Sequence, residues 1–393
     1  MLQTVTLVRN VRPWGGALSD ITIDGETIVA VSPASGETSA APDVIDGAGM
    51  LAIPGLVNTH AHVDKSWWGL PWQSYGGEGG TDGRIRHERA RRDELGIPSV
   101  GITSAVLAEF VRHGTTAIRT HVDVDLGLGL RGIEAVREAV ASYDGALACE
   151  IVAFPQDGVL RRPGVLELLA DAARSGVDHL GGLDPAGIDR DPVGQIDALF
   201  ALAAEYGCGI DIHLHDGGSL GDFQFDLIID RTERLGLAGL VNIAHGFSIT
   251  DQDPAHRRDQ LAALAALEIT LTTVAPVRHQ QFDLREFEDA GVRFGFGTDG
   301  IRDLWSPYGT GDLLGIAWQY ARGAGLVRDE DLTRVVEIAT SGGASFAGVA
   351  RNDLTAGSRA DVVLIDAENV MDALVRTLPR ERVIAGGRML FSR

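Results

Sequence analysis

The middle of the chain alternates short apolar runs with longer amphipathic segments. The amphipathic segments repeat apolar residues at helical spacing, and the clearest cover residues 104–114, 164–176, 195–207 and 259–268. The apolar runs have the length of buried strands and fall at residues 51–62, 116–124, 147–156, 179–185, 209–216, 240–246, 269–276 and 292–300. Eight strands that alternate with helices predict an α/β fold, and a (β/α)8 TIM barrel rather than an open sheet.

Both ends of the chain show a different pattern, in which short β-like runs are separated by turn residues. These runs occupy residues 4–11, 21–33, 43–55, 360–367 and 382–391. They contain no long helical period. We therefore expect the two ends to meet in one small β-sandwich, built from residues 1–54 and 346–393, beside a barrel formed by residues 55–345.

Residues with metal-binding side chains stand at the ends of four of these strands. They are His60, His62, His213, His215, His245 and Asp299. Side chains two residues apart on a strand point to the same face, so two imidazoles of one strand can reach a single ion. In a (β/α)8 barrel, the C-terminal ends of the strands form the active site. One His-x-His pair is weak evidence, but four such strand ends together predict a metal centre.

The composition indicates which binding partners and which cellular compartment to expect. The net charge of −21 argues against binding to nucleic acid or to an anionic membrane, and it favours a small neutral substrate. Two cysteines indicate free thiols rather than a disulfide framework. Because the chain has no run of 18 apolar residues and no basic, apolar leader, we expect a cytoplasmic protein.

Several motifs resemble those of the amidohydrolase superfamily: GLVNTHAHVDKS from residue 55, DIHLHD from 211, IAHG from 243, GTDGIRDLWSPYG from 297 and AGSRADVVLID from 356. The stretches RTHVDV, VAFPQDG and DLWSPYGTGDLL resemble its cytosine deaminase branch. The resemblance implies that one divalent ion is bound by His60, His62, His213 and Asp299, with His245 and Asp299 in catalytic roles. Three histidines and one aspartate suit Zn²⁺ or Fe²⁺.

The third motif departs from the cytosine deaminase pattern. There the metal histidine precedes a Cys-Asp-Glu run, whereas this chain has Leu214, His215 and Asp216, so an aspartate replaces the glutamate. The His-x-His form resembles members of the branch that remove an alkylamine from an s-triazine ring. That resemblance implies that the substrate is lined by Lys65, Gln156, Asp184, His215, His245 and Trp305. Those members have an asparagine after the metal aspartate, and Gly300 in its place argues against an identical substrate.

Lys65 is the only lysine, although the chain has 34 lysine and arginine residues in total. It follows His60 by five positions. Lysine is a compact donor whose pKa can be adjusted, whereas arginine has a larger planar group that stays charged. We therefore expect Lys65 to hydrogen-bond a ring oxygen or an anionic ring nitrogen. A solvated or ion-paired loop lysine is the alternative.

The function that follows is a mononuclear hydrolase acting on a carbon–nitrogen bond other than a peptide bond. We expect a metal-bound hydroxide to displace ammonia or an alkylamine from a pyrimidine-like or s-triazine-like ring, in a homo-oligomeric enzyme. An amide or cyclic-amide hydrolase with the same metal site is the alternative. A non-catalytic metal-binding scaffold is a further alternative, which the complete ligand set disfavours.

Other residues keep two interpretations each. His121 lies either in the pocket or in the barrel core. Among Trp67, Trp68 and Trp72, one or two stack on a planar ring while the others pack the loop. The charged run at residues 84–96 is expected to be a solvated helix face, with oligomer contacts as the alternative.

The metal count is a testable prediction. Binuclear members of the superfamily bridge two ions with a carboxylated lysine on the fourth strand, but residues 179–185 contain no lysine. We expect about one Zn²⁺ or Fe²⁺ per chain by elemental analysis, and His60→Ala or Asp299→Ala should lose both metal and activity. Two equivalents in the active enzyme would contradict the mononuclear site.

Overall fold

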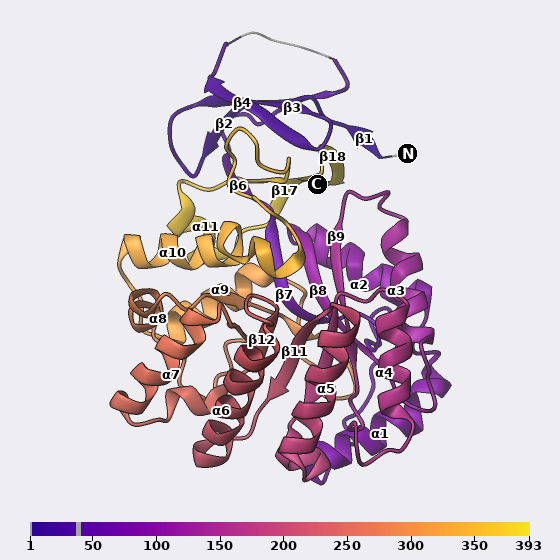
Figure 1. Cartoon of the computed structure of the whole chain (residues 1–393). Helices are drawn as coiled ribbons and strands as arrows, with labels where there is room; N and C mark the ends of the chain where they lie inside the picture. Colours follow the sequence, from indigo (N-terminus) through magenta and orange to yellow (C-terminus); the bar gives the residue numbers. More distant parts are fainter. Residues whose placement is uncertain (1, 37–40) are drawn as a thin grey trace.

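Two sheets organise the chain (Figure 1). The computed structural model describes residues 2–36 and 41–393. The larger sheet is parallel, and its strands follow the order β14-β13-β12-β11-β10-β9-β8-β7-β15. Their bounds are β7 Leu56–His62, β8 Thr115–Asp123, β9 Ala148–Phe154, β10 His179–Leu183, β11 Gly209–Leu214, β12 Val241–His245, β13 Thr270–Thr273, β14 Phe294–Phe296 and β15 Asp299–Gly300.

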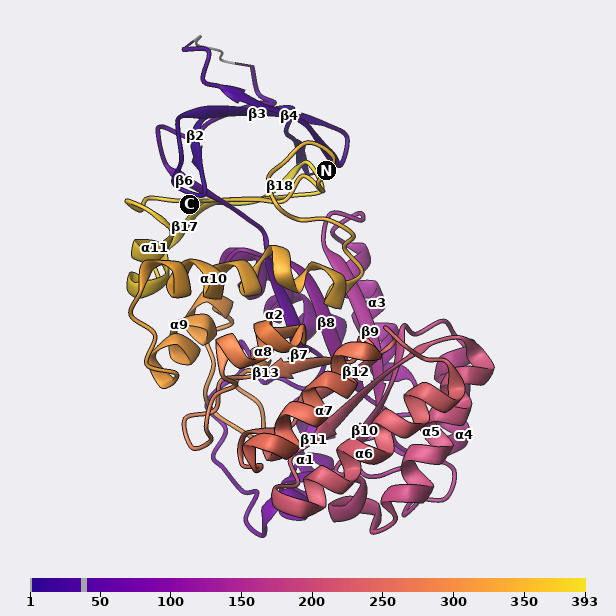
Figure 2. The ribbon, with the colours of Figure 1, turned by 60° about the vertical axis from the view of Figure 1, so that its left-hand side comes forward.

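Helices follow the strands and cover the outer face of the parallel sheet (Figure 2). Several begin at an aspartate, serine or asparagine whose side chain accepts a backbone N–H of the first turn. Their bounds are α1 Gly80–Leu95, α2 Val100–Arg112, α3 Arg131–Ala141, α4 Val165–Arg174, η1 Pro185–Asp189, α5 Pro192–Tyr206, α6 Gly218–Leu235, η2 Phe247–Thr250, α7 Pro254–Ala266, α8 Leu284–Ala290, α9 Leu313–Gly323, α10 Asp329–Ala339, η3 Ser341–Ala347 and α11 Val370–Arg376. The predicted alternation of strands and helices, and with it the α/β class, is confirmed.

The two ends of the parallel sheet meet at β7, but not through one continuous ladder. The last predicted strand is divided: β14 pairs with β13, and β15 pairs with β7. Asp299 has a φ of 56°, which interrupts the extended backbone between the two parts. Side chains of β7 bridge the interval, since Thr59 Oγ1 donates to the Phe296 carbonyl at 2.9 Å. The described ladder is therefore a strongly curled parallel sheet whose ends are joined partly by side chains.

The smaller sheet is mainly antiparallel and takes strands from both ends of the chain (Figure 1). Its strands are β1 Gln3–Thr4, β2 Leu7–Pro13, β3 Ser19–Asp24, β4 Thr27–Pro33, β5 Val44–Asp46, β6 Leu51–Pro54, β16 Val362–Ile365, β17 Arg380–Ala385 and β18 Arg388–Ser392. The predicted strand 51–62 is divided at Gly55, so that β6 lies in the smaller sheet and β7 in the larger one. The expected junction at 345/346 falls inside η3.

Strands β6 and β16 connect the hydrophobic cores of the two sheets. They pair antiparallel, and each is fully buried. Leu51 and Ile53 belong to the main core, whereas Ala52 between them belongs to the core of the smaller sheet. The alternation arises because successive side chains of a strand point to opposite faces. One strand pair thus separates the two cores and takes part in both.

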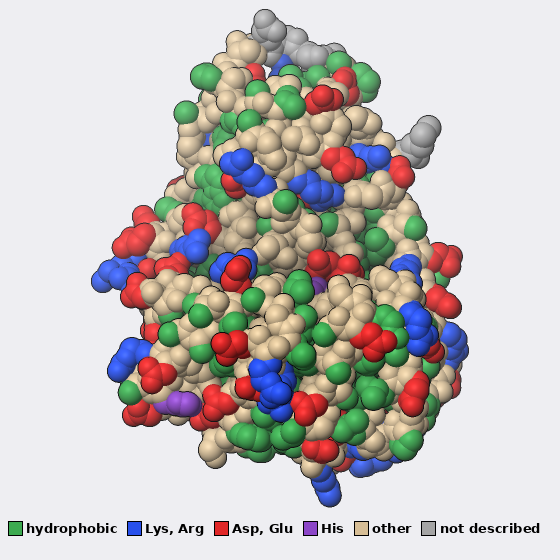
Figure 3. Space-filling model, in the orientation of Figure 1, with side chains coloured by type: hydrophobic (Ala, Val, Ile, Leu, Met, Phe, Trp, Pro, Cys, Tyr) green, Lys and Arg blue, Asp and Glu red, His purple; other side chains and the backbone are tan. Residues whose placement is uncertain are grey.

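The surface and the helices add two observations. On the face drawn in Figure 3, basic side chains lie among acidic ones rather than in one continuous basic area. Within residues 2–36 and 41–393, no single helix is long and apolar enough to cross a bilayer. The consecutive helices α1 and α2, with a bend of 107° between them, have the required length and composition only as a pair.

Gly297 lies where the last strand crosses His60, and this contact generates a prediction. A Cβ at residue 297 would lie 2.3 Å from the Cβ and 2.5 Å from the carbonyl oxygen of His60. Because the buried backbone of β7 cannot move aside, we expect Gly297→Ala to lower the free energy of unfolding by about 1–3 kcal/mol, the usual cost of overpacking. Thermal or urea unfolding measures this change.

Gly101→Ala is the matched control for Gly297→Ala. Gly101 lies on α2, and an added Cβ would meet nothing within 4 Å. The same substitution should therefore leave stability unchanged or raise it by up to about 1 kcal/mol through helix propensity. Equal effects of the two substitutions would show that the crossing at His60 is not tightly packed.

Candidate metal centre and active site

The predicted metal ligands converge at the C-terminal ends of three strands. His60 and His62 come from β7, His213 from β11, and Asp299 from β15. The three imidazoles are buried, whereas the Asp299 side chain is 41% exposed. The left-handed backbone of Asp299 is rare for a residue with a side chain, and such strain often accompanies functional positions.

The ligand atoms of these residues lie within a few ångströms of one another. His62 Nε2 is 3.2 Å from Asp299 Oδ1 and 3.3 Å from His213 Nε2. His60 Nε2 lies 3.7 Å from the same aspartate oxygen. The donor atoms of the three histidines all fall within 4.8 Å of one another, as do those of His60, His245 and Asp299. This spacing lets several side chains contact a single ion.

Unpartnered nitrogens support a metal at this position. Within residues 2–36 and 41–393, both ring nitrogens of His60 and both of His245 are buried without a hydrogen-bond partner, whereas in His62 and His213 this holds for Nδ1, the nitrogen opposite the Nε2 atoms that face the site. Buried polar atoms are normally paired, so each of these calls for a partner. Burial above all, and next the neighbouring basic side chains, hold the pKa values of His62, His213 and His245 well below the usual range, which keeps the rings neutral, as metal ligands must be.

A second group with metal-ligand atoms lies deeper in the sheet. His121 is fully buried beside His60, with ring centres 4.3 Å apart, and its Nε2 is 3.3 Å from Asp211 Oδ1. Asp211 also accepts hydrogen bonds from Arg119 at 3.1 Å and from Asn242 at 2.9 Å. Its oxygens are thus already used, and this group fits an ion less well than the group with Asp299. His121 is a core residue that supports His60.

A cavity of 1190 Å³ opens beside the histidines, and most of the predicted substrate residues line it. They are Lys65, Gln156, His215, His245 and Trp305. Asp184 is not among the lining residues; its Oδ1 accepts the backbone N–H of His215 at 2.7 Å, and the His215 Nδ1 lies 3.1 Å away. Asp184 therefore orients His215, whose ring stacks on His245 with centres 4.2 Å apart.

Of the three loop tryptophans and Asp216, only one residue lines the cavity. Trp68 lines the cavity, Trp67 is buried, and Trp72 is 65% exposed. Asp216, which replaces the family's glutamate, is not on the cavity wall; its Oδ2 accepts a hydrogen bond from Gln224 at 3.0 Å.

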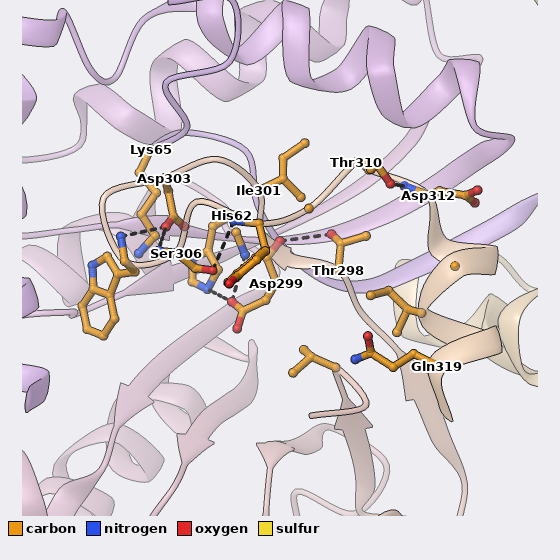
Figure 4. A pocket seen from close by; sticks show the side chains of 18 of the residues that line it. His62, Lys65, Thr298, Asp299, Ile301, Asp303, Ser306, Thr310, Asp312 and Gln319 are labelled. Atoms are coloured by element: carbon orange, nitrogen blue, oxygen red, sulfur yellow. Dashed lines mark hydrogen bonds and ion pairs between the residues drawn. The ribbon is translucent and has the colours of Figure 1, made fainter. Parts of the chain in front are cut away.

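Lys65 is buried at the cavity wall, 4% exposed, so it is not solvated, but it is a loop residue ion-paired with Asp123, as the alternative interpretation expected (Figure 4). Its Nζ donates to Asp123 Oδ1 at 3.1 Å and to the side-chain oxygen of Gln156. The rings of Phe154 and Trp305 lie 5.3 and 5.5 Å away. Burial would lower the pKa of Lys65, but the surrounding carboxylates, Asp123 foremost, raise it. Lys65 is therefore a permanent ammonium rather than an adjustable proton donor.

Four buried carboxylates surround this ammonium, and none of them was predicted from the sequence to be a site residue. They are Asp64, Glu88, Asp123 and Asp303. Burial raises the pKa of Asp64 to about 7 and that of Asp303 to about 6. Neighbouring carboxylates raise both values further, since one ammonium cannot balance all the negative charges around it. Asp64 adjoins Lys65 in sequence, and Asp123 lies in the quoted stretch RTHVDV, so both were within the motifs already recognised.

Helix α1 corrects the expectation for residues 84–96. Arg86, Arg89, Asp93 and Glu94 form the expected solvated face, but Glu88 and Arg92 are only 2% and 6% exposed, so the charged run also has a buried side. Glu88 accepts the indole N–H of Trp305, and Arg92 makes two hydrogen bonds to Asp125, at 2.6 and 3.0 Å. The inward charges of α1 thus attach the helix to the cavity wall.

A curled parallel sheet with histidines and an aspartate converging at its strand ends defines a hydrolase of the amidohydrolase type. The model of the Amidohydrolase family matches residues 99–391, so the chain belongs to this family. The predicted enzyme class, a hydrolase of carbon–nitrogen bonds other than peptide bonds, is thereby confirmed.

Individual relatives agree with this assignment. The chain is 40% identical to N-isopropylammelide isopropylaminohydrolase from Burkholderia multivorans ATCC 17616, with a TM-score of 0.92 over 98% of this chain and 97% of that one. It is 29% identical to N-isopropylammelide isopropyl amidohydrolase of Pseudomonas sp. (strain ADP), over 94% of this chain and 93% of the relative. A 5-methylcytosine deaminase from Klebsiella pneumoniae shares the fold, with 23% identity and a TM-score of 0.85 over 98% and 97% of the two chains.

The surroundings of Lys65 generate a prediction. Arginine keeps the charge, but its planar group is larger than the ammonium, which is buried between Asp123, Gln156 and two aromatic rings. We expect Lys65→Arg to lower kcat/KM for a ring-amine substrate by about 10- to 100-fold, the value of a buried charge-assisted hydrogen bond, with metal content unchanged.

The reverse exchange at a partly exposed position away from the cavity lining, Arg91→Lys, is the control. Arg91 forms a surface ion pair with Glu94, and such pairs contribute about 0–1 kcal/mol. Its kinetics should match those of the unmodified enzyme. Wild-type kcat/KM in a folded Lys65→Arg enzyme would mean that this ammonium serves no substrate contact.

Proposed function

We propose that this enzyme is a mononuclear metal-dependent hydrolase that removes ammonia or an alkylamine from a small neutral heterocycle, of the pyrimidine or s-triazine type. We further propose that the curled sheet and its helices form a (β/α)8 barrel with its active site at the C-terminal strand ends. The enzyme is proposed to be a cytoplasmic homo-oligomer. The observation that carries the proposal is that the donor atoms of three buried histidines lie within 4.8 Å of one another, with an Asp299 oxygen 3.2 Å from one of them, His62. The N-isopropylammelide hydrolases among the relatives support the ring class.

One divalent ion, Zn²⁺ or Fe²⁺, would be held by His60, His62, His213 and Asp299. Neutral imidazoles and a carboxylate are the donors that these ions accept. When bound, such an ion lowers the pKa of water towards neutrality and so makes a nucleophile available.

Asp299 and His245 are placed to move protons. Asp299 is partly open to the cavity, and both ring nitrogens of the neighbouring His245 are free of protein partners. They can accept the proton of the attacking water and return it to the nitrogen that leaves, since an amine departs more readily when protonated. His215 stacks on His245 and is fixed by Asp184, so the position of His245 is set from one side.

The opposite wall of the cavity holds the ring. The Lys65 ammonium stabilises negative charge that develops on a ring oxygen or nitrogen as the carbon becomes tetrahedral. Gln156 and Asp123 fix the direction of that ammonium, and Trp305, anchored by Glu88, offers an aromatic face beside it. The substrate is thus held between a proton-transferring wall and a cationic wall.

A substrate panel tests the proposed function. Metal-loaded enzyme should release ammonia or an alkylamine from aminopyrimidines or alkylamino-s-triazines and leave the ring intact, as followed by amine quantification and mass spectrometry of the product. Ring opening would instead favour an amide or cyclic-amide hydrolase with the same site. No turnover of any ring amine by the metal-loaded enzyme would overturn the proposal.

The proton-transfer role generates a further prediction. His245→Ala should retain the metal and lose at least about 100-fold in kcat, which is the scale of general acid–base catalysis. His256→Ala is the matched control, because that histidine lies exposed on α7 and its loss should leave kcat unchanged. If His245→Ala stays within a few-fold of wild type, proton transfer runs through Asp299 or solvent.

A further inference from the structure

Gly300 and Asp303 occupy one space on the cavity wall. Both line the cavity beside Asp299. A Cβ at residue 300 would lie 1.8 Å from Asp303 Oδ2, and the next two nearest atoms also belong to the Asp303 side chain. The missing side chain at position 300 therefore makes room for one particular group, the carboxylate of Asp303.

The Asp303 carboxylate is held in a single orientation. Its Oδ1 accepts the backbone N–H groups of Trp305 at 2.8 Å and Ser306 at 2.7 Å (Figure 4). The backbone N–H of Asp303 donates to the Ser306 carbonyl at 3.1 Å, and a β-bridge joins Asp303 to Ser66. With two donors on one oxygen and the backbone fixed at both sides, the second oxygen has a defined direction.

That second oxygen has no partner in the part of the chain that the structure describes. Asp303 is only 6% exposed, yet no hydrogen bond from residues 2–36 or 41–393 reaches its Oδ2. The Lys65 ammonium acts on it through charge, but the hydrogen bonds of Lys65 go to Asp123 and Gln156. Because Asp303 lines the cavity, this oxygen is the part of the carboxylate that a bound ring can reach, and a ring that covers it without offering a donor leaves it desolvated and unpaired.

We propose that Asp303 is a specificity-determining residue, whose Oδ2 accepts a hydrogen bond from an N–H or amino group on the edge of the heterocycle. The inference rests on the proposed function and adds the chemical class of the ring edge. Rings that carry a donor there are favoured, and rings with an N-methyl group or a bare acceptor there are rejected, because they leave the carboxylate desolvated and unpaired. This contact requires a glycine at position 300, since any side chain there would displace the Asp303 carboxylate.

Two substitutions change this contact in different ways. Asp303→Asn can keep its oxygen on the two backbone N–H groups and then presents an NH₂ donor where the wild type presents an acceptor. Gly300→Ala pushes the carboxylate out of its place. Gly315→Ala is the control, because this glycine on α9 also lines the cavity, but an added Cβ would meet nothing closer than 3.8 Å.

Binding to the metal-loaded protein tests the inference by calorimetry. The probes are cyanuric acid, an s-triazine ring with N–H donors, and its N-trimethylated derivative, which has none. We expect Asp303→Asn and Gly300→Ala each to weaken cyanuric acid binding about tenfold or more, with Gly315→Ala unchanged and the trimethylated ring no weaker than with wild type. Metal content and melting temperature report on folding.

The outcomes separate this inference from the proposed function. If all four proteins bind cyanuric acid equally, or if wild type does not bind it at millimolar concentration, Asp303 only caps its loop and the inference is overturned. If the binding contrast is found but no ring amine is turned over, the assignment of Asp303 stands and the proposed hydrolysis fails.

Discussion

The crossing of the last strand over His60 is the constraint on which the site depends. Strand β15 pairs with β7 beside His62, and Gly297 lets the chain approach the backbone of His60 without a side chain between them. This approach brings Asp299, far away in sequence, within 3.2 Å of His62. The joining of the sheet ends and the assembly of the metal ligands are therefore the same contact.

A second constraint is the balance of buried charge around Lys65. Four carboxylates share the neighbourhood of one ammonium, so some of them retain protons and others become hydrogen-bond acceptors for neighbours such as Trp305. Arginine stands at the position of every other Lys or Arg residue, but a planar guanidinium is larger than the ammonium that is buried here beside Asp123, Gln156 and two aromatic rings. The single lysine is explained by shape as much as by charge.

The sequence predicts those parts of the fold that have a local signal. The strand ends with His60, His62, His213, His215, His245 and Asp299 were identified because apolar runs ending in ligand residues are visible along the chain, and the structure brings these residues together. The division of two predicted strands was missed because it depends on single positions, Gly55 and Asp299, where the chain changes sheet or direction.

Other features have no local signal and could not be predicted. Helix α1 is charged on all sides, so nothing in its pattern shows that Glu88 and Arg92 point inward; only contacts with Trp305 and Asp125, distant in sequence, bury them. Asp184 was assigned to the substrate by resemblance, and its place behind His215 depends on the left-handed turn after β10. Asp303 likewise acquires its environment from Gly300 and the loop that follows.

The shared strand pair β6 and β16 has a consequence for the order of synthesis. Leu51 and Ile53 face the main core from β6, and the strand that covers their backbone edge, Val362–Ile365, leaves the ribosome only after all the strands of the parallel sheet. Until then the N-terminal strands present an unpaired apolar edge, which in general invites association with other chains or with chaperones. Strand β6 therefore completes its pairing only after the whole of the intervening parallel sheet has been synthesised.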